Sequence, residues 1–69
     1  MEENLNRKLE RLVLELSQHE IRLAQALRAF ERKFLEVALH RSGGNRTRAA
    51  RALGVHRNTL AHKLEIHGL

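Results

Sequence analysis

The sequence predicts an all-α protein with four helices, in which a two-helix dimerisation region with a long central helix precedes a helix-turn-helix. The chain has no proline and is rich in Leu, Ala, Arg and Glu, which favour helices. Its apolar residues recur at intervals of three and four. Its positive charge is concentrated at one end, because residues 1–40 hold seven Lys or Arg against seven Glu, whereas residues 41–69 hold six against one. This distribution indicates a polyanion-binding module attached to a neutral scaffold.

Length and composition limit the possible classes of protein. A chain of 69 residues forms one domain, residues 1–69, and buries only about 60% of the surface that its unfolded form exposes. A monomer would therefore be marginally stable, and we expect a homodimer. The absence of cysteine excludes disulfides and zinc fingers. No apolar run approaches the roughly 20 residues of a membrane span, so we expect a cytoplasmic location and no membrane partner.

The first helix is expected over residues 3–16. Its apolar residues are spaced 4, 3, 1 and 3 apart and form one stripe, opposite a charged face. These residues are Leu5, Leu9, Leu12, Val13 and Leu16. We interpret the stripe as core that is buried against a partner helix.

The second helix is expected to start at Ser17, because Ser17 and Glu20 have the spacing of a capping box. It meets no helix breaker before Gly43, which gives about 24 residues. A heptad-like seam suited to packing against a second copy follows steps of 4, 3, 4 and 3. The seam comprises Leu23, Leu27, Phe30, Phe34 and Val37. Together with Leu5, Leu9, Leu12 and Leu16, it makes residues 1–42 the predicted dimerisation region.

A second apolar set, Leu35, Ala38 and Leu39, lies beside the seam and is expected to be covered by the helix-turn-helix. Gly43 and Gly44 then predict a helix C-cap followed by a turn, and a hinge at the same place remains compatible with this assignment.

Residues 45–67 are predicted to form the helix-turn-helix. Asn45 is a good N-cap for a helix that runs to about Leu53. Gly54 follows at a position that requires positive φ. Val55 is placed to fill the angle between the two helices, and the small Ala50 allows them to cross closely.

The predicted DNA contacts fall into two groups. An arginine on the first turn of a recognition helix can donate two hydrogen bonds to guanine, which favours Arg57 as a base-reading residue. Side chains at the start of the preceding helix favour phosphate. The base-edge or phosphate set on the second helix is His56, Arg57, Asn58, Thr59, His62 and Lys63, and the phosphate set before it is Asn45, Thr47 and Arg48.

The last 27 residues, GGNRTRAARALGVHRNTLAHKLEIHGL, resemble the C-terminal helix-turn-helix of the Fis family and of NtrC-type transcriptional activators. The matching elements are the Gly-Asn start, the Ala-Ala pair, Leu-Gly followed by an aliphatic residue, Thr47, Arg48, Arg57, Thr59-Leu60 and Lys63-Leu64. The resemblance implies a homodimer with paired long helices at its centre. It also implies two recognition helices that enter successive major grooves of double-stranded DNA.

Other classes of function fit the sequence less well. The chain has no Asp and no Cys, and its serines lie beside no convincing base, so we expect neither an enzyme nor a small-molecule substrate or cofactor. His56, His62 and His67 are six and five residues apart, which does not align them on one helical face for a metal. The predicted function is transcription regulation or DNA bending in the nucleoid. The alternatives are a dimerisation module with weak or no DNA binding and the C-terminal part of a larger NtrC-type activator.

Overall fold

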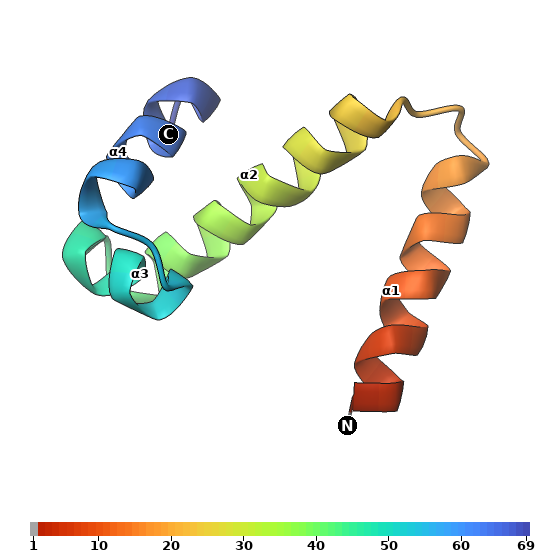
Figure 1. Cartoon of the computed structure of the whole chain (residues 1–69), viewed down its shortest axis with the longest axis horizontal. Helices are drawn as coiled ribbons and strands as arrows, with labels where there is room; N and C mark the ends of the chain where they lie inside the picture. Colours follow the sequence, from red (N-terminus) through yellow and green to blue (C-terminus); the bar gives the residue numbers. More distant parts are fainter. Residues whose placement is uncertain (1) are drawn as a thin grey trace.

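The computed structural model describes the backbone of residues 2–69 and the side chains from residue 4 onward (Figure 1). Its helices are α1 (Glu2–Ser17), α2 (Leu23–Arg41), α3 (Arg46–Leu53) and α4 (Arg57–His67). The described chain contains no strand, which confirms the predicted all-α class. In Figure 1, α1 and α2 diverge from their connection, and α3 and α4 gather at the far end of α2. None of these helices is both long enough and apolar enough to cross a membrane.

The predicted capping box at Ser17 is wrong. Ser17 is the last residue of α1, and its hydroxyl donates to the carbonyl of Leu14 at 2.7 Å instead of accepting from the next helix. Serine commonly makes such a bond to the preceding turn, and it competes with capping. Glu20 then has φ 53°, in the left-handed region where a helix cannot continue.

The second helix therefore starts later than predicted. Helix α2 begins at Leu23 and has 19 residues, whereas the sequence suggested about 24. Its N-cap is Arg22, which has extended backbone angles and donates its N–H to Oε1 of Gln25 at 3.2 Å. Arginine has no acceptor atom, so this is only the returning half of a capping box.

The other end of α2 confirms the predicted turn. The helix ends at Arg41, and Gly43 and Gly44 have φ 61° and 80°. The N–H of Gly44 reaches back to the carbonyl of Leu39 at 2.9 Å, which satisfies one of the acceptors left at the helix end. Two consecutive residues with positive φ turn the chain sharply into α3.

The two short helices also follow the local signals. Asn45 caps α3, because its Oδ1 accepts from the N–H of Arg48 at 3.0 Å. Gly54 ends α3 with φ 71°, and the N–H of Val55 donates to the carbonyl of Ala50 at 3.0 Å. A side chain at position 54 would be strained by its φ, although open space surrounds it.

The buried core lies where α2, α3 and α4 meet. It consists of Leu35, Ala49, Ala50, Leu60 and Leu64, with Leu39, Leu53, Val55 and Leu69 packed around it. The predicted orientation of Leu35 and Leu39 toward the helix-turn-helix is confirmed. Ala49 is fully buried, which shows how closely α3 approaches its neighbours. None of the described side chains of α1, residues 4–17, belongs to this core.

Candidate nucleic-acid interface

The outward side of α4 carries polar side chains at its first turns. Leu60 and Leu64 are buried and four residues apart, so they fix the side of α4 that faces the core. The remaining side chains of these turns are exposed. We call them the α4 outer face, which comprises Arg57, Asn58, Thr59, Ala61 and His62.

His56 is the N-cap of α4, a role that the sequence analysis did not assign to it. Its Nδ1 accepts from the N–H of Asn58 at 3.1 Å. Because Nδ1 accepts this bond, Nε2 is the ring nitrogen that can donate to another group. His56 can still offer its Nε2–H to a ligand, because its side chain is exposed.

The start of α3 adds further exposed groups. Asn45, Thr47 and Arg48 are all exposed, although Oδ1 of Asn45 is already engaged in capping. Arg46 and Arg51 are exposed cations of the same helix, and the sequence analysis did not single them out. Their positive charge is the feature by which the sequence analysis could have identified them as candidate phosphate contacts. Arg48 also lines an apolar groove between α2 and α3, so it lies at a border between two surfaces.

Lys63 does not share the α4 outer face, which corrects its predicted outward position. It is half-buried, and its Nζ forms an ion pair with Oε2 of Glu31 at 2.9 Å. His67, four residues further on, is buried, and its Nε2 lies 2.8 Å from Oε1 of Glu31. A spacing of four aligns these side chains on one side of α4, and the structure turns that side toward α2.

Glu31 therefore connects α2 to two residues of α4. The pKa of Glu31 lies below its ordinary value of 4.5, mainly because of the hydrogen bond from Lys63 and, second in size, the hydrogen bond with His67. Both bonds favour the ionised carboxylate. The sequence analysis missed these contacts, because Glu31 is 32 residues from Lys63 and 36 residues from His67 in the sequence, and no local pattern indicates such a pairing.

The lowered pKa of Glu31 predicts sensitivity to acid. The carboxylate stabilises the fold above the ordinary pKa of 4.5, and this contribution is lost as the pH falls through the lower pKa of the folded state. Below pH 4.5 the melting temperature of the wild type should therefore fall faster than that of Glu31→Gln, measured by circular dichroism. The control Glu15→Gln, an exposed residue of α1, should follow the wild type. Parallel curves for wild type and Glu31→Gln would contradict the expected linkage.

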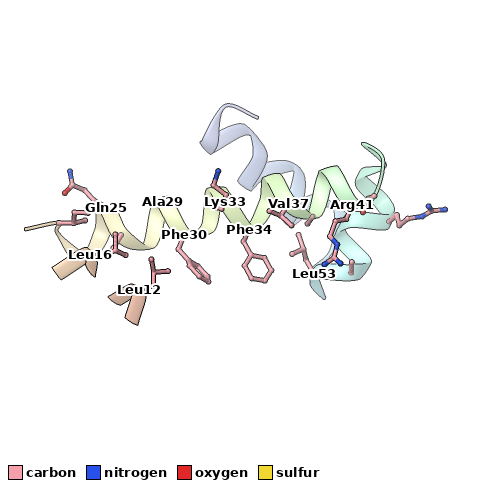
Figure 2. A pocket seen from close by; sticks show the side chains of 16 residues that line it. Leu12, Leu16, Gln25, Ala29, Phe30, Lys33, Phe34, Val37, Arg41 and Leu53 are labelled. Carbon is pink, nitrogen blue, oxygen red and sulfur yellow. The ribbon is translucent and has the colours of Figure 1, made fainter. Parts of the chain in front are cut away.

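An apolar surface runs along α1 and α2, away from the core. All of the predicted dimerisation residues are exposed except Leu16, which is half-buried; Phe34 is 54% exposed and Leu23 75%. Figure 2 shows Phe30 and Phe34 on one side of α2, toward Leu12 of α1 and Leu53 of α3. These side chains line one groove, in which the rings of Phe30 and Phe34 have centroids 5.7 Å apart. We call this surface the apolar groove.

The histidines do not meet at one place. His67 is buried beneath α2, whereas His56 and His62 are exposed on α4. Among the described side chains, residues 4–69, no three His or Glu are close enough together to hold a metal ion. The chemistry available on the α4 outer face is therefore hydrogen bonding and positive charge.

Two helices joined by a glycine turn, with a polar first turn on the second, define a helix-turn-helix protein. The chain belongs to the Fis family of bacterial regulatory proteins, whose family model matches residues 26–65. A candidate Fis-like DNA-binding protein from Ralstonia nicotianae is 46% identical over 43 residues, which are 62% of this chain and 56% of that relative. The match thus spans little more than half of the relative. No solved structure matches the chain.

Proposed function

We propose that this chain is a homodimeric, sequence-selective DNA-binding protein that acts in transcription regulation or in DNA bending within the nucleoid. The main support for this proposal is the exposed α4 outer face, which lies on the helix-turn-helix of a chain from a family of bacterial regulatory proteins. The relative described as DNA-binding supports the same partner. The excess of positive charge in residues 41–69 complements the charge of double-stranded DNA.

The residues divide between two kinds of DNA contact. Arg57 lies at the first residue of α4, where its guanidinium can reach guanine O6 and N7 in the major groove. Asn58, Thr59 and His62 are exposed beside it and can donate to or accept from base edges or phosphates. Arg48 and Thr47 lie on the first turn of α3, which suits phosphate contacts.

The apolar groove supports the homodimeric part of the proposal. A surface built from Leu12, Phe30 and Phe34 is costly to leave in water, and a chain of 69 residues has a small core of its own. Two copies related by a two-fold axis would cover it. Their recognition helices would then contact two inverted half-sites about one helical turn apart, and a closer spacing of the helices would bend the DNA toward the protein.

Arg57→Ala and Arg48→Ala should impair binding differently. The loss of Arg57 should cost about 1–3 kcal/mol on the best site and remove the preference at one base position, whereas the loss of Arg48 should weaken binding to all sequences about equally. Selection of bound sequences from a random pool, followed by affinity measurements at several salt concentrations, distinguishes the two. With about three cationic contacts in each subunit, the slope of log K against log salt should be near −5 for the wild-type dimer.

The matched control is Arg7→Ala, which removes an exposed arginine from α1, away from the helix-turn-helix. It should keep both the affinity and the sequence preference. If Arg57→Ala retains the wild-type preference at every position, Arg57 does not read a base. If the wild type binds no DNA even at low salt, the proposed function fails, and a dimerisation module without DNA binding becomes the better description.

A further inference from the structure

Polar side chains of α2 bind the C-terminal end of α4, beside the apolar packing of Leu64 and Leu69 in the core. Arg28, Glu31 and Arg32 lie on one side of α2, and we call them the α2 clasp. Nη2 of Arg28 donates to the carbonyl of Ile66 at 3.4 Å, and Nη1 of Arg32 donates to the carbonyl of His67. Glu31 accepts from Lys63 at 2.9 Å and lies 2.8 Å from Nε2 of His67.

This arrangement provides partners for every carbonyl left over at the end of α4. The last four carbonyls of a helix have no partner within it. Here the carbonyls of residues 64 and 65 accept from the N–H groups of Leu69 and Gly68, at 2.8 and 3.1 Å. The carbonyls of residues 66 and 67 accept from Arg28 and Arg32. The two arginines also place positive charge at the negative end of the helix dipole, so the clasp is complementary to α4 both in geometry and in charge.

His67 depends on Glu31 for its only side-chain hydrogen bond. The imidazole is 5% exposed, and its Nδ1 has no hydrogen-bond partner. Without Glu31, both ring nitrogens would be buried and unpartnered, which is unfavourable. The last turn of α4 would then keep only its contacts with Arg28 and Arg32 and the packing of Leu64.

The side of α2 opposite the α2 clasp carries part of the apolar groove. Phe30 and Phe34 belong to the apolar groove, whereas Glu31 and Leu35, one residue further along, face the helix-turn-helix. One rigid helix thus holds the proposed dimer surface and the end of the recognition helix. A change in the tilt of α4 against α2 would change the distance between the two recognition helices of a dimer.

We propose that Glu31 is a positioning residue, which sets the direction of α4 relative to α2 and thereby the spacing of DNA half-sites that the dimer accepts. This inference rests on the proposed function. Glu31 pairs with side chains of α4 and is not among the proposed DNA contacts. Glu31 binds Lys63 and His67 and thereby fixes the angle between α4 and α2, and with it the direction of the α4 outer face.

The first test measures half-site spacing. The wild-type, Glu31→Ala and Glu31→Gln proteins are bound to a set of DNA duplexes in which the inverted half-sites are separated by spacers that differ by one base pair. The wild type should prefer one spacing. In Glu31→Ala, the ratio of the affinity for the preferred spacing to the affinity for the other spacings should fall about tenfold, the size expected when a hydrogen bond to a charged group is removed. In Glu31→Gln this ratio should fall less, because the amide keeps the shape of the side chain. Glu15→Gln changes the net charge equally and should behave as the wild type.

The spacing preference separates positioning from a general loss of stability. A variant that is merely less folded binds all spacings more weakly and keeps the same optimum, whereas a misplaced α4 broadens or shifts the optimum. If Glu31→Ala keeps the wild-type profile of relative affinities, the positioning role is overturned. If the wild type binds none of the duplexes, the proposed function itself fails, and the positioning role in DNA binding fails with it.

The second test requires no DNA. The chain contains no cysteine, so spin labels can be attached to cysteines introduced at Arg22 and Glu65, exposed residues at the start of α2 and on α4. Doubly labelled chain is diluted with unlabelled chain, so that only distances within one subunit are observed. The wild type should give one narrow distance distribution, and Glu31→Ala a broader one, while circular dichroism shows that the helices remain. Equal widths in the two proteins would overturn the proposal, even if DNA binding is confirmed.

Discussion

Replacement of Phe34 by glutamate is expected to abolish dimerisation and, with it, site-specific DNA binding. Phe34 lies in the middle of the apolar groove and is 54% exposed in the single chain, so a second copy would bury a large part of its ring. A carboxylate there would lose the apolar contacts of the ring and would have to be desolvated beside Leu12, Phe30 and Leu53, which is unfavourable even though Lys33, Arg41 and Arg48 also line the groove.

The effect on DNA binding should be large, although every proposed DNA contact remains in the sequence. A dimer binds the second half-site as an intramolecular event, and the loss of this advantage weakens binding by about 10²–10⁴-fold. Analytical ultracentrifugation measures the oligomeric state, and a gel shift with a paired and a single half-site measures the advantage.

The matched control is Leu14→Glu. Leu14 belongs to α1 and is 58% exposed, similar to Phe34, but it does not line the apolar groove. The control should therefore remain a dimer. A folded, site-specific monomer in the Phe34→Glu variant would overturn the proposed dimer surface. The same result for both variants would show that added negative charge, rather than the position in the groove, is responsible.

The elements that the sequence predicted correctly are those whose signals are local. The N-cap at Asn45 and the αL residue at Gly54 each depend on the chemistry of one residue and its nearest backbone, so they can be recognised without knowledge of the fold. The same holds for the turn at Gly43 and Gly44. Ser17 shows the limit of such signals, because a hydroxyl can bond to the helix behind it as well as to the helix ahead.

The parts of the candidate site that the sequence did not predict depend on contacts between distant residues. Lys63 was expected on the outer face, because the apolar residues of the second helix were assigned to its inner side. Its actual partner is Glu31, and only the packing of Leu35 against α3 and α4 brings the two together. His56 was assigned to DNA because it is a polar side chain on the outward side of the second helix, and its capping bond is visible only in the structure. The DNA contacts of the α4 outer face remain a proposal.

Replacement of Leu60 by alanine should unfold the helix-turn-helix. Leu60 is 1% exposed and belongs to a core that has only two other buried leucines, Leu35 and Leu64. A buried Leu→Ala change costs about 2–5 kcal/mol, since it removes transfer free energy and leaves a cavity. A small domain is marginally stable, so a loss of this size should unfold most of the population of α3 and α4.

Urea unfolding, followed by circular dichroism at one fixed chain concentration, measures the change, since the stability of a dimer depends on concentration. The control is Ile66→Ala on the same helix, where the side chain is 52% exposed and the expected change is within about 0.5 kcal/mol. Because DNA binding requires a folded α4, Leu60→Ala should also lose affinity for all sequences, while Ile66→Ala should not. If Leu60→Ala is destabilised by less than about 1 kcal/mol, Leu60 is not packed as this core requires.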